Sequence, residues 1–255
     1  MLFLVVANVQ SSERPGGLLT ENAPIDDPLG SSAWNIMYNV HIPGARVVFD
    51  DRVIVMAPTS AENPMSVPVM VDASALSDVD KIILVADFNP ISKILEFYPT
   101  RTLAKLGFRF KIQQATPVRA LVHTSDGLWH MNGAWIDASG GGCTAPSMAS
   151  GNADWASRVG QISGKNWLRG HNMSRLKFQI NHPMDTGLAD GIPAFYLEQL
   201  VIVDQDGAEL GTIKPFEPIS EDPVFTLDVH ATGSMSLWGR DNNGNIFEAP
   251  LFPRS

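Results

Sequence analysis

The chain has 255 residues, of which 44% are hydrophobic and 18% charged, so it can build one large β domain or two small ones and is too apolar to be disordered. Its formal charge is −9 and no basic stripe stands out in the sequence, which disfavours a nucleic acid as partner. A single cysteine excludes an intrachain disulfide and a cysteine-rich zinc site.

The N-terminus begins with an apolar stretch. Residues 1–7 resemble the hydrophobic part of a secretion signal without its basic region, and they fit an apolar strand equally well. Residues 11–28 are polar and rich in Pro and Gly. We therefore assign residues 1–28 to a signal-peptide remnant and an irregular lead-in. No later run of about 18 apolar residues occurs, so we expect no membrane span.

A short helix is predicted after the lead-in. Ser31 or Ser32 can cap its first turn, and Pro43-Gly44 ends it. Its apolar face consists of Trp34, Met37 and Tyr38 at helical spacing. Such a face is more typical of packing than of a cofactor site, and we assign no cofactor to the chain.

Two series of β-strands follow, with no helices between the strands of a series. The first series is 46–56, 67–73, 81–86, 93–97, 106–114, 118–124 and 128–136. The second series is 176–180, 195–203, 208–214, 224–229, 234–240 and 246–251. Hairpin turns are predicted at Asp126-Gly127, Asp206-Gly207 and Asn243-Gly244. The pattern predicts an all-β protein made of two antiparallel β-sandwiches.

The two series define the expected domains. The stretch between them is rich in Gly, Ser, Ala and Asn, which is typical of a linker, with a helical turn expected at 152–159. We expect a first sandwich over residues 29–143, a flexible linker over 144–172 and a second sandwich over 173–255.

Cys143 lies directly after three glycines, Gly140, Gly141 and Gly142. Glycine offers no side chain for packing and populates both signs of φ, so the segment is predicted to be a flexible tether that presents an exposed thiol. A free thiol in an ordinary glycine-rich loop is the alternative. No Lys, Arg or His lies within several residues, so activation of the thiol would come from a partner's site. An exposed thiol could also join two chains through an intermolecular disulfide.

Motifs for autonomous catalysis are scarce. Gly140–Gly142 is followed by Cys-Thr and not by Lys-Ser or Lys-Thr, so the phosphate-loop pattern fails. The six histidines show no metal-binding spacing, although His123 and His130 flank a hairpin and a metal between them is an alternative. We assign no catalytic, cofactor-binding or metal-ligating residue.

Several short motifs, taken in order, resemble SoxYZ, the carrier of bacterial sulfur oxidation, with both subunits fused in one polypeptide. The SoxY-like motifs are Ala57-Pro-Thr-Ser-Ala-Glu-Asn63, Val67-Pro-Val69, Asp87-Phe-Asn-Pro90, Val118-Arg-Ala120 and Gly141-Gly-Cys143. The SoxZ-like motifs are Ile180-Asn-His-Pro-Met-Asp-Thr-Gly187, Ile192-Pro-Ala-Phe-Tyr-Leu197, Ile219-Ser-Glu-Asp-Pro223 and Trp238-Gly-Arg-Asp241.

The resemblance implies two immunoglobulin-like sandwiches and a covalent role for Cys143. In SoxYZ a haem enzyme conjugates thiosulfate to the cysteine and a hydrolase releases sulfate, so the protein is a carrier and not itself an enzyme. It also implies a periplasmic location and Sox-type enzymes as partners.

One feature differs from SoxY, whose cysteine lies on a free arm at the end of the chain. Here Thr144-Ala-Pro146 and a second domain follow Cys143, so the arm becomes a loop held at both ends. The arrangement resembles fused carriers associated with quinoprotein dehydrogenases, which adds such a dehydrogenase or a c-type cytochrome as an expected partner. The alternative function is a non-covalent scaffold for that dehydrogenase or cytochrome.

Overall fold

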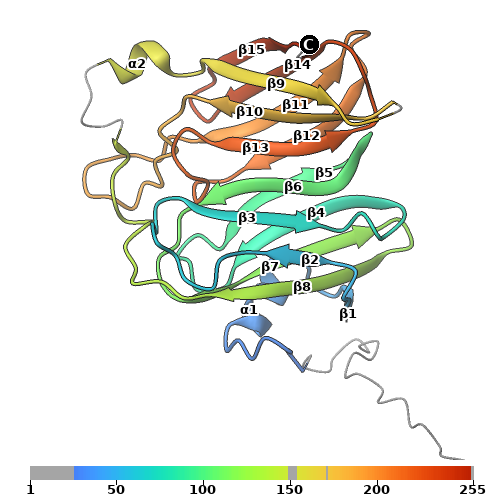
Figure 1. Ribbon diagram of the computed structural model, residues 1–255. Coiled ribbons are helices and arrows are strands. Elements are labelled where there is room, and N and C mark those ends of the chain that lie inside the picture. The colour runs from blue at the N-terminus through green and yellow to red at the C-terminus, as the bar shows by residue number, and fades with distance from the viewer. Residues whose placement is uncertain (1–25, 149–153, 171, 254–255) are drawn as a thin grey trace, which may run out of the picture.

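The computed structural model describes residues 26–148, 154–170 and 172–253. The expected signal-peptide remnant therefore lies outside the described residues. The described part contains two short helices, α1 (Trp34–His41) and α2 (Trp155–Arg158), and strands in two stacked sheets (Figure 1). Neither of these helices is long and apolar enough to cross a membrane.

Sheet A has nine strands. In spatial order they are β1 (Arg46–Phe49), β8 (Leu128–Ile136), β7 (Thr116–Thr124), β4 (Val79–Ala86), β5 (Lys93–Tyr98), β12 (Glu209–Pro215), β11 (Leu197–Asp204), β14 (Met235–Asp241) and β15 (Ile246–Leu251). All neighbours are antiparallel except β1 and β8, which run parallel.

Sheet B has six strands. In spatial order they are β2 (Ile54–Met56), β3 (Val67–Asp72), β6 (Thr102–Phe110), β13 (Val224–Val229), β10 (Ser174–Ile180) and β9 (Ile162–Leu168). Every neighbouring pair in this sheet is antiparallel. The fold class is thus confirmed: the protein is nearly all β, with a short helix at its N-terminal side.

The two halves of the chain share both sheets. In sheet A, β5 of the first half pairs with β12 of the second, and in sheet B, β6 pairs with β13. One continuous apolar core results, containing for example Phe97 and Leu106 from the first half and Ile213 and Leu227 from the second. The halves are therefore joined edge to edge, as the blue-to-green and orange-to-red strands of Figure 1 show.

Alternation along the strands explains why two layers form. In β6, Leu106, Phe108 and Phe110 are buried while Lys105 and Arg109 point away from the core. Successive side chains of a strand lie on opposite faces, so this pattern allows one face to pack on the opposite sheet and leaves the other to solvent. Burial of the apolar face supplies the driving force for stacking.

Helix α1 covers the outer face of sheet A. Trp34 and Met37 pack with Val85, Leu121 and Met131 in a second, smaller apolar cluster. The predicted apolar face is therefore confirmed. The N-cap is Ala33, whereas Ser31 or Ser32 was predicted. The Ser31 hydroxyl instead accepts a hydrogen bond from the Ala33 amide, two residues on, in the turn that precedes the helix.

The predicted hairpin turns are confirmed. Gly127, Gly207 and Gly244 all have φ between +79° and +84° and connect β7 to β8, β11 to β12 and β14 to β15. A left-handed backbone in a two-residue turn favours glycine, so the Asp-Gly and Asn-Gly pairs were a reliable signal.

Two sequence-based expectations need correction. The run 46–56 is two strands in different sheets, because Asp50 and Val53 form a turn between them. The expected linker 144–172 contains α2, which lies inside the predicted helical turn at 152–159, and also strand β9, which pairs with β10 along its whole length. The composition of β9, a mixture of small, polar and apolar residues, is that of a linker. The segment becomes a strand because it pairs with β10.

Candidate functional site

Cys143 lies buried where the two halves meet. Its side chain is 1% exposed, and its thiol donates a 3.5 Å hydrogen bond to the carbonyl oxygen of Lys111, which follows β6. The expectation of an exposed thiol is therefore wrong for this structure. A disulfide between two chains would first require movement of residues 139–148, which we call the cysteine segment.

The three glycines fix the cysteine segment against the fold. The Gly141 amide donates to the Gln113 carbonyl over 3.2 Å, and the Gly142 amide donates to the Ile112 carbonyl over 3.0 Å. A Cβ on Gly142 would lie 2.1 Å from the Pro64 carbonyl oxygen. The expected flexible tether is thus held in place here, because the missing side chains allow the backbone to approach so closely.

Polar side chains of both halves also hold the cysteine segment. The Thr186 hydroxyl donates to the Cys143 carbonyl over 2.7 Å, while the Gln113 side-chain oxygen accepts from the Cys143 amide over 3.1 Å. Further along, Asp185 accepts hydrogen bonds from the amide and the hydroxyl of Ser147. The segment is thus closed by hydrogen bonds that a modest rearrangement could break.

A lysine lies next to the thiol. Lys111 is 1% exposed, and its ammonium group donates to the Met184 carbonyl. Burial lowers the pKa of Lys111 to about 8, opposed by the charges of Asp185, Cys143 and Glu221. Because the lysine is separated from Cys143 by more than thirty residues of sequence, the local sequence around the cysteine could not reveal it.

Burial also determines the state of the thiol. It raises the pKa of Cys143 to about 11, and the positive charge of Lys111 partly opposes that rise. The thiolate is the nucleophilic form, so the closed thiol is unreactive near neutral pH. Burial therefore keeps Cys143 in its protonated, unreactive form.

The histidine pair proposed as a metal alternative does not form. His123 is placed opposite Trp129 and His130 opposite Val122, so the two imidazoles lie on opposite faces of the hairpin. His130 Nδ1 lies 2.8 Å from Asp50 and His123 Nδ1 lies 2.6 Å from Asp80. Within the described residues, no group of three or more His, Cys, Asp or Glu side chains is arranged to hold a metal ion.

His182, in one of the SoxZ-like motifs, is buried close to the cysteine segment. Its Nδ1 accepts a 3.2 Å hydrogen bond from the Met184 amide, and its Nε2 lies 3.6 Å from Asp241. Burial lowers the pKa of His182 to about 4, so the imidazole is neutral near pH 7. A cavity of about 570 Å³ lies beside it and is also lined by Met148 of the cysteine segment.

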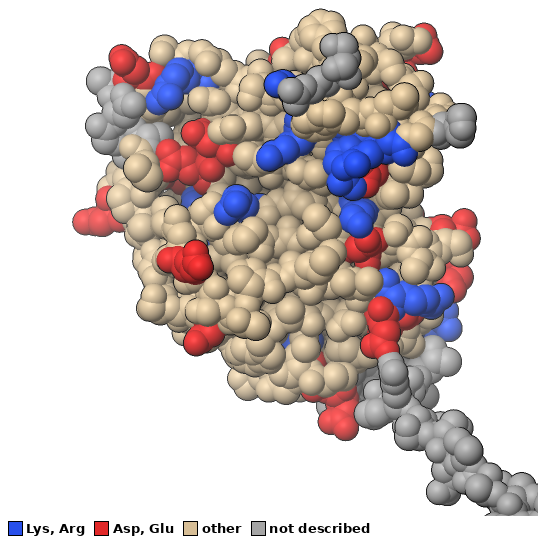
Figure 2. Space-filling view, viewed as in Figure 1, with Lys and Arg blue, Asp and Glu red and all other residues tan. Residues whose placement is uncertain are grey.

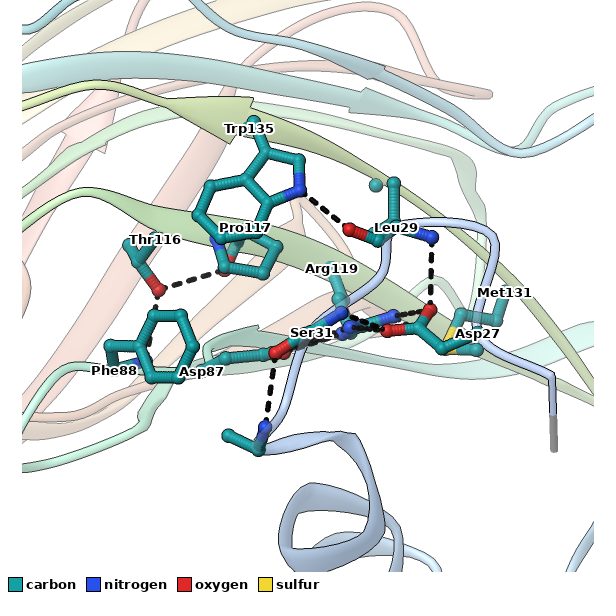
Figure 3. Close-up of polar contacts among 12 residues, drawn as sticks. Asp27, Leu29, Ser31, Asp87, Phe88, Thr116, Pro117, Arg119, Met131 and Trp135 are labelled. Carbon is teal, nitrogen blue, oxygen red and sulfur yellow. Dashed lines mark hydrogen bonds and ion pairs between the residues drawn. The ribbon is translucent and has the colours of Figure 1, made fainter. Parts of the chain in front are cut away.

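Two SoxY-like motifs meet in a buried ion network rather than at the thiol (Figure 3). Arg119 donates to Asp87 over 2.8 to 3.0 Å and to Asp27 over 2.6 and 2.8 Å. Its guanidinium lies 4.7 Å from the ring centre of Trp34. These residues attach the lead-in and helix α1 to sheet A, so their role is structural.

Sequence reasoning identified the cysteine but missed its surroundings. Asp185 and Thr186 stood in a SoxZ-like motif to which no role was assigned, and Lys111 and Gln113 gave no signal of their own. The SoxZ-like motif that contains Asp185 and Thr186 did mark part of the site, because Thr186 contacts Cys143. Only the tertiary structure brings these residues together.

The fold and the site define a two-part, immunoglobulin-like β protein that stores one thiol where its halves meet. Residues 41–143 match the family of sulfur oxidation protein SoxY, and residues 168–251 match the family of sulphur oxidation protein SoxZ. The chain therefore belongs to the Sox sulfur-oxidation proteins as a fused SoxYZ-like protein.

No curated protein is significantly similar in sequence. Among solved structures, the sulfur carrier protein SoxY from Chlorobium limicola f thiosulfatophilum is similar at 17% identity and a TM-score of 0.38, over 42% of this chain and 91% of that chain.

Proposed function

We propose that this protein is a covalent carrier that holds a sulfur compound, thiosulfate in the first instance, on Cys143 and presents it to periplasmic oxidoreductases. The observation that carries the proposal is the SoxY match, which ends at Cys143, the single thiol of the chain. A carrier needs one reactive atom and no catalytic base of its own. It also needs that atom to stay unreactive between encounters with its partners. The buried, high-pKa thiol is consistent with the last requirement.

The attachment step is an oxidation, and we propose that a c-type cytochrome is the oxidant. The thiol of Cys143 loses its proton, an S–S bond forms to the outer sulfur of thiosulfate, and two electrons pass to two ferric haems of a c-type cytochrome. The product is a thiosulfonate on the cysteine. A Sox-type enzyme or a quinoprotein dehydrogenase with its cytochrome would then act on the bound group.

Burial of Cys143 adds a requirement to this function. The cysteine segment must open before the thiol can reach a partner's active site, because the thiol is 1% exposed when the segment is closed. The hydrogen bonds from Thr186 and to Asp185 are the contacts that opening breaks. Each is worth about 1 kcal/mol, so binding of a partner can supply the free energy of opening.

Intact-mass spectrometry tests the carrier function. The protein is incubated with thiosulfate and an oxidised c-type cytochrome of the Sox type, and a thiosulfate-derived mass increase is expected on the peptide that contains Cys143. Cys143→Ser is the control and should gain no mass. An adduct that persists in Cys143→Ser would show that the cysteine is not the attachment point.

The burial of Cys143 favours a second candidate, a non-covalent scaffold for a periplasmic quinoprotein dehydrogenase or cytochrome. In that case the thiol is incidental. Cys143→Ala separates the two functions: a scaffold keeps its partner's activity unchanged in this variant, whereas a carrier loses turnover while still binding its partner.

A further inference from the structure

The outer face of sheet B carries a straight row of residues from all six strands. Each residue is directly opposite the next in the sheet register. The row is Lys165, Lys177, Thr226, Gly107, Met70 and Met56. One end of this face is therefore basic and the other is apolar, and the chain's two halves supply three strands each.

The charge of this face is opposite to that of the whole protein. The strands of sheet B contain five basic residues, Lys105, Arg109, Lys165, Arg175 and Lys177, and two acidic residues, Asp72 and Asp228, a net charge of +3. The chain as a whole has a net charge of −9. Figure 2 shows this face, with Lys and Arg side chains over its upper half, a group of Asp and Glu side chains toward its left edge, and a largely uncharged surface below.

Both acidic residues are already paired. Asp72 accepts from Lys105 over 2.6 Å, and Asp228 forms an ion pair with Arg175 at 2.7 Å. Over the described ranges, Arg109, Lys165 and Lys177 have no ion pair, and all three side chains are exposed. Three cations on this face therefore lack a counter-charge.

Two of these cations oppose each other. Lys165 on β9 and Lys177 on β10 are direct cross-strand neighbours. Like charges directly opposite on one face of a sheet destabilise it, and among the described residues neither lysine has an ion pair that would offset this cost. Carboxylates from another molecule would remove the repulsion on binding.

A groove of about 510 Å³ lies along the same face. Met56, Pro68 and Met70 line it on the apolar side, and Arg109 and Lys177 line it on the basic side. Met56 is 46% exposed, and methionines adapt their shape to a bound surface. The groove therefore fits an apolar side chain flanked by carboxylates.

We propose that this face of sheet B is the docking surface for an acidic protein partner. A partner that presents Asp or Glu side chains around an apolar anchor matches both the unpaired cations and the methionine-lined groove. A nucleic acid fits less well, because its single-stranded forms need aromatic stacking platforms and its duplex forms need more phosphate contacts than three unpaired cations supply.

The position of the surface relative to the thiol supports docking. Arg109 lies two residues before Lys111, whose carbonyl oxygen accepts from the Cys143 thiol. The Arg109 guanidinium also donates to the Ser66 carbonyl over 3.1 Å, near Pro64, which contacts the cysteine segment. A partner seated in the groove therefore lies near the end of β6 that leads to Lys111 and the cysteine segment. The docking surface does not itself depend on what the cysteine carries.

Photo-crosslinking followed by affinity measurement tests the proposal. A benzophenone amino acid replaces Thr226 in the groove, or Trp238 on the outer face of sheet A as a control, in the full chain expressed in its source cells. Proteins captured at Thr226 alone are identified by mass spectrometry and purified. Their dissociation constants are then measured by calorimetry for wild type, Lys177→Glu, Lys214→Glu and Cys143→Ser.

Lys214→Glu is the control for charge reversal elsewhere, because Lys214 is a half-buried lysine on a strand of sheet A and does not line the groove. We expect a captured protein of negative net charge, a dissociation constant raised at least about tenfold by Lys177→Glu and less than about twofold by Lys214→Glu, and weaker binding at higher salt. Cys143→Ser should bind like wild type, so failure of the carrier function leaves this result unchanged.

Three outcomes would overturn the proposal: no protein captured at Thr226, a captured partner of positive net charge, or equal weakening by both charge reversals. Binding of phosphatidylglycerol vesicles or duplex DNA that is lost in Lys177→Glu, with no protein captured, would replace the protein partner with an anionic lipid or a nucleic acid.

Discussion

The hydroxyl of Thr186 donates a 2.7 Å hydrogen bond to the carbonyl oxygen of Cys143. The bond connects the last residue of the SoxY match to a residue inside the SoxZ match. In the fused chain, the second domain therefore holds the cysteine of the first. The cysteine segment of the first half is thus closed against the second half.

Removing that bond should expose the thiol more often. Thr186→Val keeps the shape of the side chain and leaves the Cys143 carbonyl without its donor, so opening of the cysteine segment becomes easier by about 1 kcal/mol. We expect the reaction of Cys143 with a thiol reagent at neutral pH to become roughly fivefold faster. Thr212→Val, which removes a hydroxyl that donates to Glu209 far from the thiol, should leave the rate unchanged.

A methyl group on Gly142 should displace the cysteine segment altogether. Its Cβ would lie 2.1 Å from the Pro64 carbonyl oxygen and 2.6 Å from that of Ile112, and neither backbone can move cheaply. Gly142→Ala should therefore make Cys143 react nearly as fast as a free thiol while the thermal unfolding transition stays cooperative. Gly107→Ala, whose Cβ meets only ordinary contacts in sheet B, is the control. A buried thiol in Gly142→Ala would contradict the packing described here.

Because of Lys111, the free energy of unfolding should rise with pH above about pH 8. Its pKa is about 8 in the folded protein, below its ordinary value of 10.5. Below pH 8 both states hold the proton and the cost of burying the ammonium group is present in full. Between pH 8 and 10.5 the folded state has released a proton that the unfolded chain keeps, so the free energy of unfolding rises with pH.

Urea denaturation at pH 7 and pH 9 measures this effect. We expect the contribution of Lys111 to raise the free energy of unfolding by roughly 1 kcal/mol over that interval. Lys111→Met should remove the rise, and Lys177→Met, which changes an exposed lysine, should keep it. An identical pH slope in wild type and Lys111→Met would mean that the buried lysine does not titrate in this range.

The Arg119 network should dominate the stability of the first half. Arg119→Met leaves the carboxylate of Asp87 buried without its partner, which costs about 3 to 5 kcal/mol. Arg240→Met breaks an ion pair with Glu198 in which both side chains are partly exposed, and it should cost less than about 1 kcal/mol. Equal losses in the two variants, measured by urea denaturation, would contradict a structural role for the network.

The sequence determined the strands and hairpins of this protein and identified Cys143 as its single thiol. Alternating apolar residues, as in β6, and Asp-Gly or Asn-Gly turns act over two to four residues, so strands and hairpins could be predicted locally. Cys143 could also be recognised locally, because it is the single cysteine of the chain and follows three glycines. Strand β9 was not predicted from the sequence, because its composition is that of a linker and its pairing with β10 is a tertiary contact.

Only the tertiary structure decided how those elements pair and where that thiol lies. The pairing of β5 with β12 and of β6 with β13 joins residues more than one hundred positions apart, and no local pattern specifies it. Burial of Cys143 under Thr186 and beside Lys111 follows from that joining, because the second half must be in place to close the segment. Flexibility of a glycine run is a property of an isolated chain, whereas in the folded protein the same missing side chains permit close packing and hold the thiol still.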